Sequence, residues 1–212
     1  MVASAEAPHV PDRFVFASGN AGKRREVARI LAPCEILGLD AFPGLALPEE
    51  GDDYLENALA KAAAVAAATG WASLADDSGL EVDALGGRPG VHSARYGGPD
   101  LDDAGRVERL LRALAAVPEP RSARFVCIAA CVLPDGRRFA VRGVCEGTIA
   151  LAPRGRGGFG YDPIFVPAGA SASWAELEQA EKDRRSHRGE AFRGLLRALE
   201  ERMPASQAKS RG

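Results

Sequence analysis

Apolar and polar positions follow two different periods along the chain, so the sequence predicts both strands and helices. Residues 13–16 form a short apolar run, residues 27–31 carry apolar side chains at helical spacing, and 35–39 is a candidate second strand. The alanine-rich segment 56–69 favours a helix because alanine has the highest helix propensity, and Gly70 suits its end.

The second half of the chain contains a strong hairpin signal. Residues 134–136, Pro-Asp-Gly, separate two largely apolar runs, 124–133 and 137–145. Helical patterns precede and follow this pair, at 102–114 and 192–199. Because hairpin strands occur beside strand-to-helix crossovers, we predict an α/β fold with a mixed central β-sheet flanked by helices.

The composition is compatible with one folded domain. At 212 residues and 46% hydrophobic composition, the chain can bury a full core, with two lobes around a substrate cleft. No stretch approaches the length of a membrane span, and residues 1–12 lack the apolar core of a secretion signal. We therefore expect a cytoplasmic protein, and its four cysteines agree because none forms a CxxC pair.

The charge disfavours one class of partner. With 27 basic and 29 acidic residues the net charge is −2, which argues against a nucleic-acid polymer as the main partner. A small anion is still compatible with this balance, because local lysines and arginines or a metal ion can neutralise it.

The loop after the first predicted strand has the shape of an anion cradle. It consists of Ser18, Gly19, Asn20, Ala21, Gly22 and Lys23. Small residues let the backbone approach a phosphate, N–H groups at a helix start point outward, and Lys23 adds a positive charge. The loop is not a P-loop, because only two residues separate Gly19 from Gly22 and Arg24 follows the lysine. The alternative is a plain turn between strand and helix.

Two adjacent aspartates, Asp76 and Asp77, follow a predicted short strand over residues 72–75. Neighbouring residues of an extended chain point to opposite faces, so we expect one aspartate to face the cleft and the other to bond elsewhere. Paired carboxylates at a strand end suit Mg²⁺, which takes one or two carboxylates plus waters and substrate phosphates. The alternative is an Asx-turn that closes the strand at Ser78.

Three further polar segments have both a structural and a functional interpretation. The acids of 49–56 suit a helix start, although one of them could bind a metal ion. The glycine loop 155–163 carries aromatic rings that belong to a core or stack on a base. Lys182 and the segment 186–190 form a solvated basic face, or donate to phosphate and to carbonyl oxygens of a base.

Together these segments resemble one family, the inosine triphosphate pyrophosphatases, also called the Ham1 family of non-standard purine nucleoside triphosphate pyrophosphatases. The resemblance spans about residues 14–200, so we expect a single domain, 13–203, between flexible tails, 1–12 and 204–212. The matching segments are Ser18 to Lys23 with Glu26, Glu56-Asn57-Ala58 with Lys61, Ala75 to Leu80, Pro89 to Tyr96, Gly158 to Pro163, and Ser186 to Gly189.

The resemblance implies an activity, a cofactor and an assembly. The activity is hydrolysis of ITP, dITP or XTP at the α,β linkage to the monophosphate and pyrophosphate, which cleans the nucleotide pool. The implied cofactor is Mg²⁺, with Mn²⁺ as a substitute, and the implied assembly is a homodimer. Guanine must be distinguished at its 2-amino group, where xanthine carries an oxo group.

By matching position, the resemblance also implies roles for individual residues. Asp77 would hold the metal ion and act as general base, with Asp76 and Lys23 completing the catalytic set. Glu49 fits the second metal ligand by spacing, although Glu50, directly before Gly51, is the alternative. The implied substrate contacts are Ser18, Gly19, Asn20, Ala21, Gly22 and Lys23 for the phosphates, and Ser78, Phe159, Gly160, Tyr161, Asp162, Lys182, His187 and Arg188 for the rest of the nucleotide.

Two other functions compete with this interpretation. One is a related pyrophosphatase that acts on pyrimidine or modified nucleotides, and the other is a nucleotide-binding module without catalysis. The Asp76-Asp77 pair and Lys23 argue against the second alternative. A P-loop ATPase or kinase is disfavoured by the glycine spacing.

Overall fold

Seven strands of the described chain, residues 10–203, form one sheet in this computed structural model, in the order β2-β1-β3-β5-β6-β7, with β4 paired to β3. β1 runs parallel to β2 and β3, whereas the other pairings are antiparallel. The sheet is therefore mixed, as predicted. The strands are β1 (Arg13–Phe16), β2 (Glu35–Leu37), β3 (Ser73–Val82), β4 (Pro89–Gly90), β5 (Ser122–Val132), β6 (Arg138–Ile149) and β7 (Phe165–Pro167).

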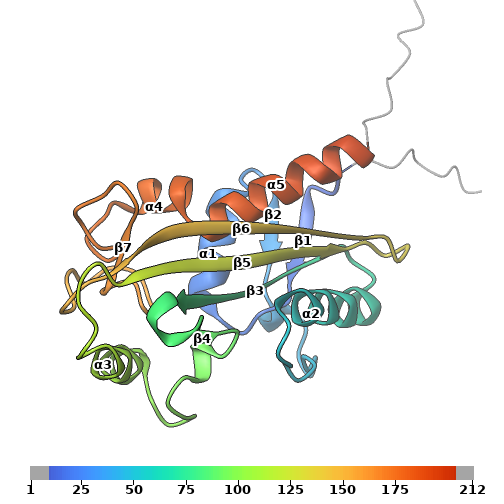
Figure 1. Ribbon diagram of the computed structural model, residues 1–212. Helices are drawn as coiled ribbons and strands as arrows, with labels where there is room; N and C mark the ends of the chain where they lie inside the picture. The colour runs from blue at the N-terminus through green and yellow to red at the C-terminus, as the bar shows by residue number, and fades with distance from the viewer. Residues whose placement is uncertain (1–9, 204–212) are drawn as a thin grey trace, which may run out of the picture.

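Helices cover both faces of this sheet (Figure 1). α1, α4 and α5 lie on one face and α2 on the other, while α3 packs near the end of the sheet where β3 finishes. Side chains of Asn20, Asp53, Asp102 and Ser186 accept backbone N–H groups at the starts of α1, α2, α3 and α5. The helices are α1 (Ala21–Ile30), α2 (Tyr54–Thr69), α3 (Asp103–Ala113), α4 (Gln179–Arg185) and α5 (His187–Arg202).

Two residues of the expected N-terminal tail contact the folded domain. Val10 packs against the core below α1 and α5, and the carbonyl of Asp12 accepts the N–H of Glu35 at 2.8 Å. The remaining parts of the two expected tails, 1–9 and 204–212, lie outside the described residues. Within residues 10–203, no helix has the length and apolar character needed to cross a membrane.

β3 is much longer than the sequence predicts. The expected strand end at Asp76 is wrong, because β5 pairs with β3 over its whole length, from Ser73 to Val82. On its other edge β3 pairs with β1 only as far as Leu74, and with β4 only from Leu80 onward. The two aspartates therefore sit in the middle of a strand, beside an edge that no other described strand covers.

The same stretch of β3 separates two parts of the hydrophobic core. Alternate residues of a strand share a face, and on one face Leu74 belongs to the cluster under α1 and α5. Leu80 and Val82, further along that face, belong to the cluster that includes α3. Asp76 and Ser78 lie between the two clusters. This polar interruption places a cleft between two lobes, as the sequence analysis predicts.

The close approach of α5 to β6 gives a test of the packing. A Cβ at Gly143 would lie 2.2 Å from the carbonyl oxygen of His187 and 2.6 Å from the nitrogen of Ala191. We expect Gly143→Ala to lower the free energy of unfolding by about 1–3 kcal/mol, because the backbone of α5 must move.

Denaturant unfolding measures this change, and Gly51→Ala is the control. Its new methyl group would have only one neighbour, Asn57 Oδ1 at 3.8 Å. The control should shift stability by less than about 0.5 kcal/mol. Equal stabilities of the two variants would show that the packing of α5 on β6 does not require a glycine at position 143.

Candidate active site

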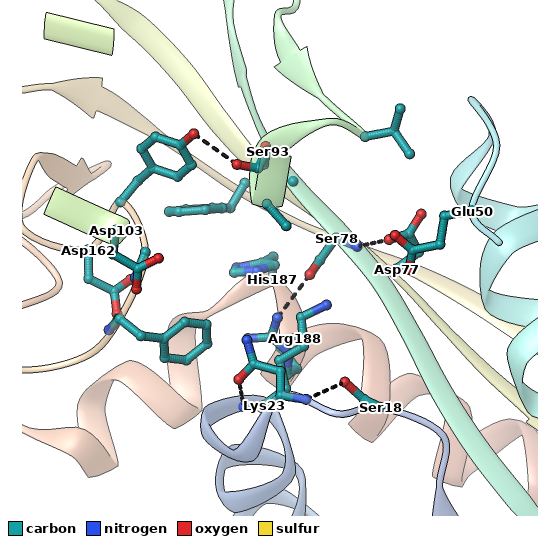
Figure 2. A pocket seen from close by; sticks show the side chains of 18 of the residues that line it. Ser18, Lys23, Glu50, Asp77, Ser78, Ser93, Asp103, Asp162, His187 and Arg188 are labelled. Atoms are coloured by element: carbon teal, nitrogen blue, oxygen red, sulfur yellow. Dashed lines mark hydrogen bonds between the residues drawn. The ribbon is translucent and has the colours of Figure 1, made fainter. Parts of the chain in front are cut away.

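A cavity of about 270 Å³ opens beside the uncovered edge of β3 (Figure 2). Most of the predicted site residues line it, although they come from four distant segments of the chain. Ala21, Gly22, Asp76 and Glu49 do not line it. The predicted residues that do are Ser18, Gly19, Asn20, Lys23, Asp77, Ser78, Phe159, Gly160, Tyr161, Asp162, Lys182, His187 and Arg188.

The loop from Ser18 to Lys23 is held in shape by its own side chains. The hydroxyl of Ser18 accepts the N–H of Asn20 at 3.1 Å, and Asn20 caps α1 by accepting the N–H of Lys23 at 3.0 Å. Gly22 lies under the ring of Phe159, where a Cβ would be 3.0 Å from the ring. The first turn of α1 thus faces the cavity with its positive end, which favours a bound anion.

Asp76 is buried behind the cavity wall, where it binds two cations by ion pairs. Its side chain is 0% exposed, and Oδ2 lies 3.1 Å from both Lys23 Nζ and Arg188 Nη2 and accepts the Ser78 hydroxyl at 3.0 Å. Burial would raise the pKa of Asp76, but Lys23 and Arg188 outweigh it and hold this pKa well below its usual range. Asp76 therefore fixes two cations that line the cavity.

Asp77 points to the opposite face of β3, toward α2. Asn57 Nδ2 donates to its Oδ2 at 2.8 Å, and Lys61 Nζ lies 3.8 Å from its Oδ1. Burial raises the pKa of Asp77, although Lys61 and Asn57 act in the other direction. As predicted, one aspartate faces the cavity and the other bonds elsewhere. A carboxylate in a cavity with a raised pKa is suited to accept a proton.

Of the two glutamates left open by the sequence, Glu50 is the one that lines this end of the cavity. It lies 2.5 Å from Lys61 Nζ, whereas Glu49 is outside the wall. The pairing with Lys61 turns Glu50 inward, and its sequence neighbour consequently faces solvent. Spacing along a loop could not distinguish the two glutamates, because their orientation depends on α2.

Asp77 and Glu50 flank the same ammonium group, so their carboxylates lie on one side of the cavity. Within residues 10–203, no group of three or more histidines, cysteines or acids is arranged as a metal cage. Two carboxylates fit a divalent cation that takes its other ligands from water and from substrate phosphates. The residues present therefore suit a metal ion that binds together with its substrate.

At the other end of the cavity, two buried cations share the buried carboxylate of Glu26, and one of them also pairs with Asp162. Lys182 Nζ lies 2.5 Å from Asp162 and 2.8 Å from Glu26, and Arg188 Nη1 donates to Glu26 at 2.5 Å. Both cations also lie near the ring of Phe159, at 4.9 and 5.8 Å from its centroid. Burial opposes ionisation of Glu26, but Arg188 and Lys182 hold its pKa below the usual value.

Aromatic rings complete this end of the cavity. The ring of His187 stacks on Phe125, with centroids 4.7 Å apart and planes 9° apart. Burial lowers the pKa of His187 well below its usual value, so the ring is neutral, and its Nδ1 has no hydrogen-bond partner among the described residues. The Tyr161 hydroxyl donates to the carbonyl of Ser93 at 2.9 Å. Flat apolar walls of this kind suit a heteroaromatic base.

Several polar residues of the site have no role predicted from the sequence. Asn57 and Lys61 carried a usable signal, since they are polar side chains one helical turn apart on the buried face of an alanine-rich helix. Glu26 occurs in a matched motif, but nothing in the pattern shows that it is buried. Asp103 and Arg106 of α3 also line the cavity, and no local pattern distinguishes them from solvent-facing charges.

Comparison with known proteins identifies the family of the chain independently of the site geometry. The profile described as the Ham1 family matches residues 14–198. A dITP/XTP pyrophosphatase of Thermus thermophilus is 51% identical over 195 residues, which cover 91% of this chain and 94% of that protein. One of Nocardia farcinica is 52% identical over 194 residues, which cover 88% and 94% of the two chains.

Solved structures are similar over nearly the same range. A HAM1 protein from Coxiella burnetii superimposes with a TM-score of 0.79 at 41% identity, covering 89% of this chain and 98% of its own. A nucleoside-triphosphatase, dITP/XTP pyrophosphatase, from Mycobacterium abscessus gives a TM-score of 0.69 at 45% identity, covering 87% and 98%. The fold around the cavity is therefore shared with these proteins.

The buried ion pairs predict the effect of one neutral substitution. Glu26→Gln removes a carboxylate that Lys182 and Arg188 share, so two buried cations lose a partner. We expect the free energy of unfolding to fall by about 3–5 kcal/mol. Thermal or denaturant unfolding at neutral pH measures the loss.

The control is Glu35→Gln, the same chemical change at an exposed ion pair with Arg13. Exposed pairs contribute little, so the control should lose no more than about 1 kcal/mol. If Glu26→Gln lost no more stability than Glu35→Gln, the buried network would not be the stabilising element described above.

Proposed function

The chain belongs to the Ham1 family, and we propose that it hydrolyses the triphosphates of non-standard purine nucleosides to a monophosphate and pyrophosphate. The relatives named dITP/XTP pyrophosphatase align over 94% of their own length, which supports the same enzyme class for this chain. One observation carries the proposal. The cavity joins a carboxylate with a raised pKa, Asp77, to an aromatic pocket at its other end.

The end of the cavity near Asp77 supplies the chemistry of hydrolysis. Lys23, Lys61 and the first N–H groups of α1 offset the charge of the phosphates and of the departing pyrophosphate. Asp77 accepts the proton of the attacking water, and the amide of Asn57 keeps its carboxylate oriented. Mg²⁺ would be held by Asp77 and Glu50, and when bound it neutralises phosphate oxygens and orients the reacting groups.

The aromatic end selects the base. Arg188 uses its Nε–H, both Nη2–H groups and one Nη1–H on Asp76, Ser78 and Glu26, which leaves one Nη1 hydrogen. That donor suits the 6-oxo group of hypoxanthine or xanthine. Adenine presents an amino group at this position, so the donor would lose its partner in a buried site.

A cytoplasmic location and a homodimeric assembly complete the proposed function. The four cysteines are free, and this is compatible with a reducing compartment, so we place the enzyme in the cytoplasm. A homodimer is carried over from the resemblance to the family. Size-exclusion chromatography with light scattering tests the assembly directly.

A triphosphate panel tests the proposed reaction. The purified protein with Mg²⁺ should release pyrophosphate and monophosphate from ITP, dITP and XTP far faster than from ATP, GTP, dTTP or UTP. Faster turnover of dTTP or UTP would favour a pyrimidine enzyme, and binding without any product would favour a non-catalytic module. Release of orthophosphate would exclude cleavage at the α,β linkage.

The role of Asp77 predicts the phenotype of an isosteric variant. Asp77→Asn keeps the shape of the site but removes the base and a negative charge, so kcat should fall at least about 100-fold while nucleotide binding stays measurable. Steady-state kinetics and calorimetric titration separate these effects. Asp52→Asn, an exposed acid of the neighbouring loop, should keep full activity. A near-normal kcat for Asp77→Asn would contradict the assigned role.

A second pair of variants tests which glutamate binds the metal ion. Glu50→Gln should raise the Mg²⁺ concentration needed for half-maximal activity by about tenfold or more, because a hard cation loses a charged ligand. Glu49→Gln should leave this concentration unchanged, since Glu49 lies outside the cavity. Magnesium titrations of both variants measure the effect, and the reverse order would restore Glu49 as the ligand.

A further inference from the structure

One cation of the cavity has no place in the mechanism described above. Arg106 of α3 lines the cavity, and its side chain is only 15% exposed. Its Nε is buried and has no hydrogen-bond partner among residues 10–203. Its one ion pair is loose, with Nη1 3.5 Å from Asp103 Oδ1. Because Nε is enclosed by protein, the terminal nitrogens of the guanidinium are the donors that face the cavity, and a bound group that accepts from them would gain affinity.

Arg106 lies at the aromatic end of the cavity. Asp103, its partner, appears beside Asp162 in Figure 2, away from Glu50 and Asp77, and its Oδ2 accepts the N–H of Gly160 at 2.7 Å. With the phosphates at the Asp77 end, the base enters this end with the edge farthest from the sugar. That edge carries positions 6, 1 and 2 of the purine. α5 thus approaches the base from one side and α3 from another.

We propose that Arg106 is a specificity-determining residue, which donates to an oxo group at position 2 of the base and selects xanthine over hypoxanthine and guanine. The inference rests on the proposed function, since it concerns the same substrate class. Arg188 has one donor left for the base, and that donor suits position 6. A second oxo group needs a second donor, and the terminal nitrogens of Arg106, which have only the loose contact with Asp103 among residues 10–203, are at this end of the cavity.

The three bases differ at position 2 in a way that a guanidinium can distinguish. Xanthine has an oxo acceptor there, hypoxanthine a hydrogen atom, and guanine an amino donor. A guanidinium has five donors and no acceptor, so it can pair only with xanthine. If guanine occupied the site, its 2-amino group and the guanidinium would both be hydrogen-bond donors, with no acceptor between them in a largely dehydrated site. This disfavours the binding of guanine.

Asp103 acts on this selection indirectly, as a positioning residue. One of its oxygens holds Arg106, and the other holds the backbone of the glycine loop that carries Phe159. The carboxylate of Asp103 thereby sets the distance between Arg106, which would bind position 2 of the base, and the ring of Phe159, which would stack on it.

The experiment compares wild type, Arg106→Gln, Arg106→Lys and Arg112→Gln, with pyrophosphate release from XTP, ITP and GTP as the readout. Arg112 is a matched control, because it lies on the same helix but is 70% exposed and paired with Glu108. The measured quantity is the ratio of kcat/KM for XTP to that for ITP. Both values come from the same protein sample, so a partly unfolded variant does not change the ratio.

We expect Arg106→Gln to lower the XTP-to-ITP ratio about tenfold or more, as for loss of a charged hydrogen-bond donor, and to raise the GTP-to-ITP ratio. Arg106→Lys should be intermediate, and Arg112→Gln should match wild type. Calorimetric titration with the monophosphates XMP and IMP should show the same loss of preference without catalysis.

A ratio for Arg106→Gln within twofold of wild type would overturn the inference and leave the proposed function intact. A parallel change in Arg112→Gln would also overturn it, since the effect would then belong to the charge of α3 as a whole. If wild type released pyrophosphate from none of the purine triphosphates, the proposed function would fail and this inference with it.

Discussion

The carboxylate of Asp76 lies in the middle of a strand without access to solvent, and several other elements are arranged to match its charge. Lys23 reaches it from α1 and Arg188 from α5. Arg188 also needs Glu26 of α1, which Lys182 of α4 shares. An unpaired charge in such a place costs several kcal/mol. α1 and α5 are therefore bound to β3 through charge as well as through apolar packing, and α4 joins this network through Lys182.

Four carboxylates of the site fall into two pairs with different roles. Asp76 and Glu26 each pair with two cations, so their effect is to orient Lys23 and Arg188 toward the cavity. Asp77 and Glu50 share a single lysine and keep the capacity to bind a cation or a proton. A site whose polar groups are already oriented does not need to reorganise as charge develops in a reaction. The stability of the fold and its chemistry therefore depend on the same contacts.

How much the sequence predicts depends on how local each interaction is. The helices over 56–69 and 102–114, the hairpin and the loop at Ser18 follow from short-range patterns, and all appear in the structure. The length of β3 could not be predicted, because it depends on pairing with β5, some fifty residues away. Glu50 could not be chosen over Glu49, and Arg106 was missed, for a related reason: contacts formed in the fold, with Lys61 for Glu50 and with Asp103 for Arg106, accompany their places in the cavity. Resemblance identified the family, but burial and partners are properties of the fold.

The uncovered edge of β3 has a consequence beyond catalysis. Unpaired strand edges are where a second chain can add a strand, and proteins protect them with charge or by keeping them short. Here the gap spans only the residues between Leu74 and Leu80, and β1 and β4 close it on both sides. Its two carboxylates make the edge unsuitable for an added strand. The unpaired edge of β3, which leaves room for a nucleotide, is therefore also protected against edge-to-edge aggregation.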